Sequence, residues 1–176
     1  MTDGEEGRGF LEWTLEFREL EEADHRLLLE WLLRPHVRLW WDEGEHTIEK
    51  VREAYGPEPG VGRFIAVLRS KELGTDRPFG YFQHYRADEN TVGIDQFIGE
   101  PDLIGKGLGT RAVAAFTDMV FSMLAPERII LDPHPDNGRA IRCYEKAGFR
   151  HCGITAGDGR QPAYLLELLI NDVRNR

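Results

Sequence analysis

Apolar positions near the start of the chain repeat first with the period of a strand and then with that of a helix. The strand is predicted by apolar residues that alternate with polar ones, at Leu11, Trp13, Leu15 and Phe17. The range 22–33 carries a helical stripe made of Ala23, Leu27, Leu28, Trp31 and Leu32. Because proline cannot continue a helix from its interior, this helix is expected to end near Arg34, before Pro35.

The middle of the chain predicts one short helix and then an antiparallel meander. Thr47 can cap a helix that reaches Tyr55, and the glycines and prolines of 56–60 then interrupt regular structure. Apolar runs separated by turn residues predict three consecutive strands, at 63–69, 79–86 and 92–98.

From residue 107 onward, helical and strand patterns alternate. The strongest helical stripe covers 107–124 and stops before Pro126. A strand at 128–131, a helix at 136–147 closed by Gly148, and a last strand at 163–170 follow. No repeat, low-complexity segment or linker divides this pattern. We therefore expect residues 10–171 to form a single domain around one mixed α/β sheet, preceded by a disordered segment at 1–9.

The composition is that of a globular protein and disfavours nucleic-acid binding. Hydrophobic residues make up 41% and charged residues 30% of the 176 positions. The 31 acidic side chains against 22 basic ones give a formal charge of -9, which repels phosphate backbones. The same charge suits a small cationic substrate, although acidity that only keeps the protein soluble explains it as well.

Cysteine, histidine and apolar content limit the remaining classes. Cys143 and Cys152 lack CxxC spacing, and the polar stretch 1–9 contains no secretory apolar segment, so we expect a cytoplasmic protein with reduced thiols. The six histidines show no metal-ligand spacing, so no metal is expected. No apolar run approaches the roughly 20 residues that span a bilayer, so no membrane association is expected.

Three glycines at alternate positions, Gly105, Gly107 and Gly109, lie at the start of the strongest helix. Such glycines let backbone N–H groups approach phosphate oxygens at a helix N-terminus, so the loop is a candidate pyrophosphate site. The spacing matches neither a P-loop nor the G-x-G-x-x-G dinucleotide fingerprint, which excludes ATP and NAD sites of those two kinds. A glycine-rich turn without a ligand is the alternative from the loop alone.

The run Asn-Gly-Arg-Ala-Ile-Arg-Cys-Tyr-Glu-Lys-Ala-Gly-Phe at 137–149, placed after that loop and helix, resembles the GCN5-related N-acetyltransferase superfamily. The resemblance implies that superfamily's fold, a central, mostly antiparallel sheet flanked by helices, and acetyl-coenzyme A as the acyl donor. It also implies that the glycine loop binds the pyrophosphate, that the helix beginning at Asn137 flanks the pantetheine arm, and that Tyr144 lies near the thioester sulfur. The cofactor-binding residues expected from it are Phe97, Ile98, Gly105, Lys106, Gly107, Leu108, Gly109, Thr110, Asn137 and Ala140.

One position departs from the superfamily pattern. Ile104 stands where most members have Gln or Arg, and Lys106 is expected to supply part of the missing charge.

The segment 93–99, with Asp132-Pro133 and the pair Trp40-Trp41, resembles the aminoglycoside 6'-N-acetyltransferases. That resemblance implies acetyl transfer to the 6'-amino group of an aminoglycoside, with Asp95 as the general base and Asp132 holding the cationic sugar. The chemistry is consistent, since a protonated amine cannot attack a thioester until a carboxylate within reach removes its proton. A structural aspartate that accepts a hydrogen bond within its strand is the alternative for Asp95 alone.

Tyr144 and an aromatic pair complete the expected site. As the thiolate of coenzyme A leaves, the Tyr144 phenol can protonate it, and the N–H groups of Phe97 and Ile98 can polarise the thioester carbonyl. The expected substrate-binding residues are Trp40, Trp41, Asp42, Asp95, Gln96 and Asp132, in which the tryptophans offer an aromatic wall and the carboxylates bind ammonium groups. Core packing is the alternative for Tyr144 and for at least one tryptophan.

Two other functions stay open at this stage. A siderophore-pathway N-acyltransferase that acts on a lysine-derived amine or hydroxylamine would share the superfamily motifs, but such enzymes usually carry His where this chain has Asp95. A non-catalytic acyl-coenzyme A binding module is the second, and the presence of both Asp95 and Tyr144 argues against it. Both a monomer and a homodimer agree with the sequence.

Overall fold

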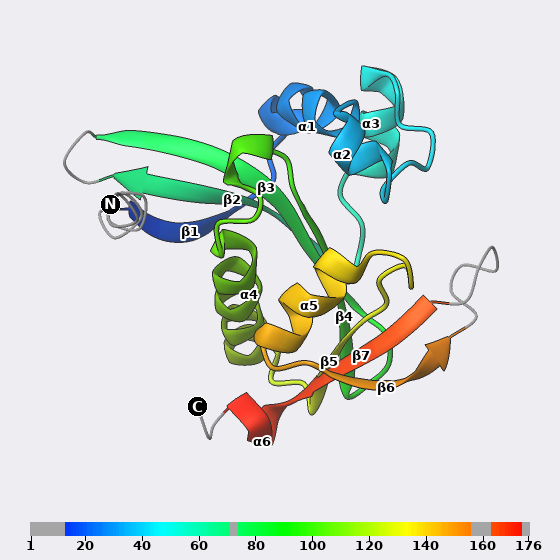
Figure 1. Ribbon diagram of the computed structural model, residues 1–176. Helices are drawn as coiled ribbons and strands as arrows, with labels where there is room; N and C mark the ends of the chain where they lie inside the picture. Colours follow the sequence, from blue (N-terminus) through cyan, green and yellow to red (C-terminus); the bar gives the residue numbers. More distant parts are fainter. Residues whose placement is uncertain (1–12, 71–73, 156–162, 174–176) are drawn as a thin grey trace.

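The computed structural model describes residues 13–70, 74–155 and 163–173, whose strands form one seven-stranded sheet (Figure 1). The strand order is β1-β2-β3-β4-β5-β7-β6. The strands are β1 (Trp13–Glu19), β2 (Val61–Ser70), β3 (Thr75–Arg86), β4 (Thr91–Ile98), β5 (Arg128–Leu131), β6 (Arg150–Thr155) and β7 (Ala163–Leu169). Only β4 and β5 pair in parallel among these strands. The expected mixed, mostly antiparallel sheet is therefore confirmed.

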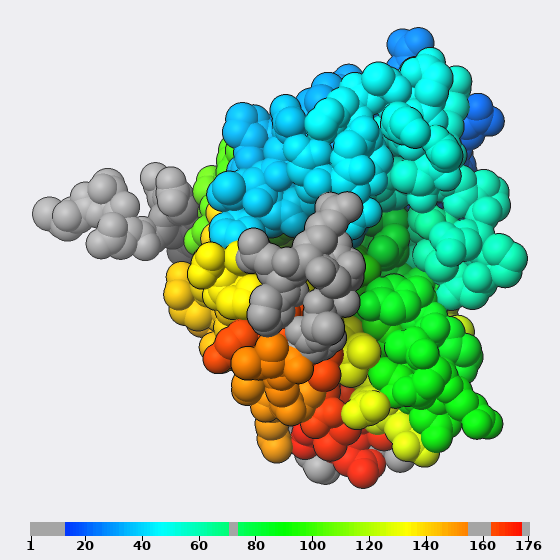
Figure 2. Space-filling view, turned by 90° about the vertical axis from the view of Figure 1, so that its right-hand side faces the viewer, coloured from blue at the N-terminus to red at the C-terminus, as the bar shows by residue number. Residues whose placement is uncertain are grey.

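The helices fall into two groups on opposite faces of this sheet. The first group follows β1 and precedes β2 in the sequence, and it contains α1 (His25–Leu32), α2 (Pro35–Arg38) and α3 (Ile48–Ala54). The second group contains α4 (Leu108–Leu124) and α5 (Gly138–Lys146), which lie side by side in Figure 1. A short α6 (Ile170–Val173) follows β7, and single 3-10 turns occupy Glu22–Asp24 and Pro101–Leu103. In Figure 2 the first group, blue to cyan, forms one end of the molecule.

Alternate side chains of the central strands face two separate hydrophobic cores, because successive residues of a strand point to opposite faces. Phe64 and Phe82 face the core that contains Phe116 of α4. Their odd-numbered neighbours Ile65 and Tyr81 face the core built with α1 and α3. Each helix group is thus held to its own face of the sheet.

The parallel pair β4 and β5 separates soon after it forms. The two strands are paired only from Thr91 opposite Arg128 to Gly93 opposite Ile130. β4 continues to Ile98 along β3, whereas β5 ends at Leu131. Beyond Gly93, no described strand covers this edge of β4.

Most predicted elements are confirmed, and the differences have local causes. The helix predicted at 107–124 is α4, which begins at Leu108. Pro35 does end the first helical run, but it also begins α2, because proline at the first helical position has no N–H to lose. The predicted strand at 79–86 begins earlier, at Thr75, and contains Pro78 next to a bulge between Ala66 and Val67.

Strand β6 was not predicted. Its sequence, Arg-His-Cys-Gly-Ile-Thr, has no clear alternation, and it pairs as the sheet's last strand with β7 alone. Leu11, expected in the first strand, and the expected disordered segment at 1–9 lie outside the described residues. Within the described part of the chain, no helix is long and apolar enough to span a bilayer.

Candidate active site

The glycine loop adopts a backbone that non-glycine residues avoid. Gly105 has φ 79° and Gly107 has φ 77°, and Gly107 is the N-cap of α4. The left-handed region costs an L-residue about 1–2 kcal/mol, so these glycines are required by conformation. No side chain caps α4, and its first N–H groups, from Leu108 to Thr110, lack acceptors within the helix. The loop thus presents unpaired backbone donors where an anion would bind.

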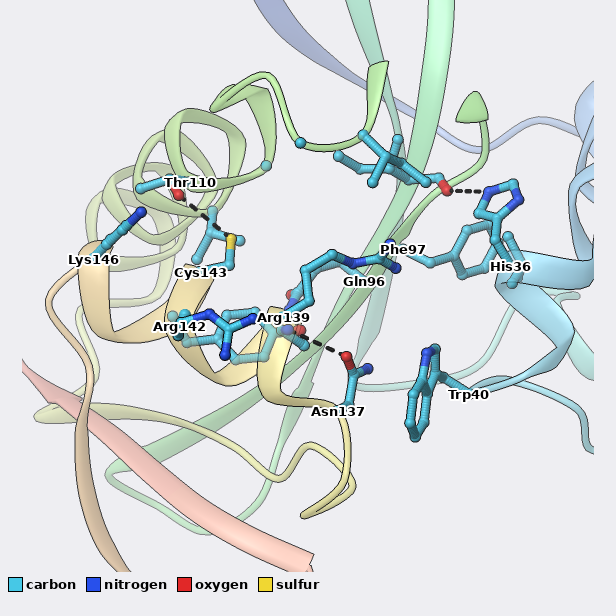
Figure 3. A pocket seen from close by; sticks show the side chains of 18 of the residues that line it. His36, Trp40, Gln96, Phe97, Thr110, Asn137, Arg139, Arg142, Cys143 and Lys146 are labelled. Atoms are coloured by element: carbon cyan, nitrogen blue, oxygen red, sulfur yellow. Dashed lines mark hydrogen bonds between the residues drawn. The ribbon is translucent and has the colours of Figure 1, made fainter. Parts of the chain in front are cut away.

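Helix α5 forms the opposite wall. Its N-cap is Asn137, whose Oδ1 accepts a hydrogen bond from the Ala140 N–H at 3.2 Å. The Thr110 hydroxyl on α4 donates to the Cys143 sulfur at 3.6 Å. Between the two helices and β4 lies a cavity of about 300 Å³, here called the glycine-loop cavity (Figure 3). The expected residues that line it are Phe97, Ile98, Gly105, Gly107, Gly109, Thr110, Asn137 and Ala140, with Tyr144.

Basic side chains face this cavity from α5. Arg139, Arg142 and Lys146 line it, which their i, i+3 and i+7 spacing on one helix face allows (Figure 3). Lys106, expected to replace the charge missing at Ile104, does not line the cavity, and neither does the side chain of the buried Leu108. The positive charge is therefore supplied by α5. Helical spacing within the 137–149 run was the signal that could have identified these three residues.

The pairing of β3 and β4 decides which amides of β4 are free. Gly99 N–H donates to the Phe79 carbonyl, so by the alternation of an antiparallel ladder Phe97 N–H faces Tyr81 on β3. The same alternation directs the N–H groups of Gln96 and Ile98 to the edge that β5 leaves uncovered. Of the two amides expected to polarise a thioester, Ile98 alone lies on this open edge.

Asp95 lies on β4, and one of its carboxylate oxygens accepts a hydrogen bond. Gln83 Nε2 donates to Asp95 Oδ2 at 2.9 Å. Burial raises the pKa of Asp95 to about 6, the Gln83 hydrogen bond opposes this, and the charges of Asp132 and Glu43 add to it. A carboxylate with such a pKa is ionised at pH 7 and is basic enough to accept a proton from an amine.

Tyr144 reaches β4 from the other face. Gln96 Nε2 donates to the Tyr144 hydroxyl oxygen at 2.8 Å. Burial raises the pKa of the phenol above its ordinary value, so it stays protonated at neutral pH. Because Gln96 donates to this oxygen, the phenol's own hydrogen is free to be donated elsewhere.

A second cavity, of about 670 Å³, opens on the other side of Gln96 and Tyr144 and is here called the acidic cavity. Five carboxylates line it, those of Asp42, Glu43, Glu45, Asp95 and Asp132. Arg63 also lines it, but Arg63 is tied to the carbonyl oxygens of Ala54 and Gly56 and to Glu58. The two cavities share the lining residues Trp40, Trp41, Gln96, Asn137 and Tyr144. The two cavities therefore adjoin at these residues.

Asp42 is an exposed carboxylate that is paired with two basic side chains. It accepts hydrogen bonds from Arg38 at 3.0 Å and from His46 Nε2 at 2.6 Å. These bonds lower the pKa of Asp42, so it is ionised throughout the neutral range.

The two tryptophans differ in their surroundings. Trp41 packs against Phe97 at 5.1 Å between ring centroids and donates its Nε1–H to the Tyr55 hydroxyl at 2.8 Å. Trp40 is 37% exposed and faces the His134 ring at 5.6 Å. Trp41 therefore combines core packing with a place in the cavity wall, whereas Trp40 is partly exposed beside His134.

Every substrate-binding residue expected from the sequence lines the acidic cavity: Trp40, Trp41, Asp42, Asp95, Gln96 and Asp132. The residues that sequence reasoning did not propose include Glu45, Tyr55, Gln83 and Tyr85. Gln83 and Tyr85 alternate on β3 directly across from the Asp95 segment, so the predicted meander carried a usable signal for them. Among the described residues, no cluster of His, Cys, Asp and Glu could hold a metal ion.

Comparison with known proteins agrees with this geometry. Residues 21–155 match the family model described as an acetyltransferase (GNAT) domain. The aminoglycoside N(6')-acetyltransferases type 1 of Klebsiella pneumoniae and Serratia marcescens are both 38% identical, over 81% of this chain and 77% of those proteins. A kanamycin resistance protein of Rhizobium radiobacter is 43% identical over 46% of this chain and 75% of its own length.

Solved structures of aminoglycoside acetyltransferases also match this chain. Aminoglycoside acetyltransferase AAC(6')-Ib, solved with paromomycin and acetyl-coenzyme A, matches with a TM-score of 0.81 and 34% identity, over 92% of this chain and 96% of that one. The same enzyme with coenzyme A and kanamycin matches with a TM-score of 0.81 and 33% identity, over 92% of this chain and 98% of that one. The chain therefore belongs to the aminoglycoside 6'-N-acetyltransferases of the GNAT acetyltransferase family.

Proposed function

We propose that this protein transfers the acetyl group of acetyl-coenzyme A to the 6'-amino group of an aminoglycoside in the cytoplasm. The observation that carries the proposal is the meeting of a cation-lined cavity and a carboxylate-lined cavity at Gln96 and Tyr144. A polyphosphate donor suits the first cavity and a polycationic acceptor suits the second. The relatives solved with acetyl-coenzyme A, paromomycin and kanamycin support the same pairing of ligands.

In the proposed reaction, Asp95 accepts a proton from the 6'-ammonium group, directly or through a water molecule. The neutral amine nitrogen then forms a bond to the acetyl carbon, and the Ile98 N–H stabilises the charge that develops on the carbonyl oxygen. When the carbon–sulfur bond breaks, the electron pair stays on sulfur and Tyr144 can donate its phenolic proton there. The attacking nitrogen loses its second proton to water, and Tyr144 regains a proton from water. The products are a neutral amide and coenzyme A.

Donor binding is proposed to use backbone and cations together. The N–H groups at the start of α4 are suited to the pyrophosphate, and Arg139, Arg142 and Lys146 to the remaining negative charge. Asn137 and Ala140, at the start of α5, are suited to contacts with the pantetheine arm.

Thiol release from acetyl-coenzyme A tests the acceptor. Kanamycin, tobramycin and gentamicin components are compared with an aminoglycoside that carries a 6'-hydroxyl group and with N-hydroxylysine. We expect turnover with the 6'-amino compounds and none with the 6'-hydroxyl compound. Absence of turnover with every 6'-amino aminoglycoside would contradict the proposal, and preference for N-hydroxylysine would favour the siderophore-pathway alternative, against which Asp95 argues.

A further inference from the structure

A chain of two hydrogen bonds leads from the core to Asp95. The Tyr81 hydroxyl donates to Gln83 Oε1 at 2.6 Å, and Gln83 Nε2 donates to Asp95 Oδ2 at 2.9 Å. Tyr81 and Gln83 lie two residues apart on β3, so their side chains leave the same face of the sheet. Gln83 is the cross-strand partner of Asp95 in the antiparallel pairing of β3 and β4. The sheet register itself therefore brings the three groups together.

Tyr81 cannot easily move. Its side chain is fully buried, with ring centroids of Tyr55, Phe97 and Trp41 at 5.3, 5.6 and 6.0 Å. Its aromatic neighbours therefore fix the place of the hydroxyl group at the inner end of the chain.

The Tyr81 hydroxyl also supports the direction of the Gln83 amide, because it donates to the amide oxygen. A glutamine amide can turn over with little steric change, which would exchange its donor and acceptor ends. The ionised Asp95 carboxylate can only accept, so Nε2 faces Asp95 and Oε1 is left to accept from the Tyr81 hydroxyl. The positive charge of Arg63 acts on the Tyr81 oxygen, which favours a hydroxyl hydrogen that points away from Arg63, as one donated to Gln83 does.

With Oδ2 of Asp95 occupied by an N–H donor, rotation of the carboxylate is restricted and Oδ1 is the oxygen left for proton transfer. We infer that Gln83, oriented by Tyr81, is the positioning residue that holds Asp95 for deprotonation of the acceptor amine. This inference rests on the proposed function, because it gives Asp95 a partner within that same reaction.

The groups that face Asp95 come from several elements. Asp132 follows β5, Glu43 follows α2, Tyr85 lies on β3, and Tyr144 reaches the strand from α5. Burial and the two carboxylates raise the pKa of Asp95, and the Gln83 N–H opposes them by stabilising the ionised form. Removing that donor should therefore raise the pKa of Asp95 further above about 6.

The pH dependence of kcat/KM in Gln83→Met tests the inference. Methionine keeps the length of the side chain but has no N–H donor. In the wild type, kcat/KM should fall on the acid side with a midpoint near pH 6, which is the acid limb of the profile. In Gln83→Met we expect this midpoint to shift to higher pH by about one unit, and the maximal kcat/KM, the plateau, to fall about tenfold. Affinity for coenzyme A, measured by calorimetry, should stay unchanged and shows that the variant is folded. A plateau that falls without movement of the limb would indicate a merely structural glutamine and would overturn the inference.

Tyr81→Phe gives an independent test that keeps the buried ring. Without the hydroxyl, the Gln83 amide oxygen loses its donor and the amide is held less firmly against Asp95, so we expect a limb shift in the same direction but smaller than that of Gln83→Met. Tyr164→Phe is the control, because it removes a phenol from β7 outside both cavities and outside the hydrogen-bond chain. Equal shifts in Tyr81→Phe and Tyr164→Phe would overturn the assigned role of Tyr81.

Asp95→Asn separates this inference from the proposed function. If Asp95→Asn keeps the wild-type kcat, the proposed base fails whatever Gln83 does. If Asp95→Asn abolishes turnover while Gln83→Met keeps the wild-type limb, only the inference about Gln83 fails.

Discussion

The glycine-loop cavity and the acidic cavity share Gln96 and Tyr144, yet they are built from different parts of the polypeptide. The first depends on backbone conformation at Gly105 and Gly107 and on one face of α5. The second depends on carboxylates that come from the loop after α2, from β4 and from the residues after β5. In the proposed function, binding of the donor is thus specified by short, continuous segments, whereas binding of the acceptor depends on how distant segments fold together. Substitutions should be able to impair one cavity and spare the other.

Asp95→Asn is expected to give the largest difference between the effects on the two cavities. Asparagine cannot accept the proton of the acceptor amine, so kcat should fall by about 10²–10⁴-fold, the usual range for loss of a general base. Steady-state kinetics should show this loss, while calorimetry shows nearly unchanged affinity for acetyl-coenzyme A. A kcat equal to that of the wild type would remove Asp95 from the mechanism.

Gly107→Ala should act on the other cavity. With φ at 77°, alanine costs about 1–2 kcal/mol unless the loop rearranges, and a rearranged loop misplaces the α4 N–H groups. We expect affinity for coenzyme A to fall about tenfold, with little change in the KM of the aminoglycoside.

Gly60→Ala is the control for Gly107→Ala, since Gly60 has φ 83° and lines neither cavity. It should lower the melting temperature without changing coenzyme A affinity. Equal loss of coenzyme A affinity in both variants would show that the effect comes from stability and not from the loop.

Tyr144 lies at the boundary of the two cavities, and Tyr144→Phe should have a smaller effect on turnover. A thiol leaving group with a pKa near ~8.5 needs less protonation than an alkoxide, so we expect kcat to fall by about tenfold or less. Tyr164→Phe, which removes a phenol from β7 outside both cavities, is the control. If kcat is unchanged in Tyr144→Phe, Tyr144 has no role as a proton donor.

A separate effect concerns stability, and it depends on pH. The pKa of Asp95 in the folded protein, about 6, lies above its ordinary value, so the ionised carboxylate opposes folding above about pH 6 and ceases to do so toward pH 4. Asp95→Asn should therefore stabilise the ligand-free protein by about 1–3 kcal/mol at pH 7.5. Melting curves should show little difference from the wild type at pH 4. A pH-independent difference would contradict the raised pKa.

The sequence predicted the parts of the site that lie within one local segment. The glycine loop with α4, and the helix at 136–147 closed by Gly148, were predicted because spacing, capping and periodicity are local properties. The expected acidic-cavity residues were found by resemblance, and all of them line that cavity. Lys106 was expected to line the glycine-loop cavity and does not, since a loop position alone does not determine the direction of a side chain.

What the sequence could not predict depends on pairing between segments. The choice between the Phe97 and Ile98 amides follows from the register of β3 against β4, which no local pattern determines. Gln83 gains its contact with Asp95 through the same register. β6 is held by β7 and not by its own pattern, so it was missed for the same reason.

The separation of β4 from β5 leaves Gln96 and Ile98 as amides on an uncovered sheet edge, next to an Ile98 carbonyl that accepts from His36 at 3.0 Å. Pantetheine contains amide groups of its own, so an extended pantetheine arm can pair with this edge as an additional strand would. Coenzyme A binding should then slow deuterium exchange of the Gln96 and Ile98 amides more than that of the Phe97 amide, which already faces β3. The cofactor would in this way complete the sheet that the polypeptide leaves open.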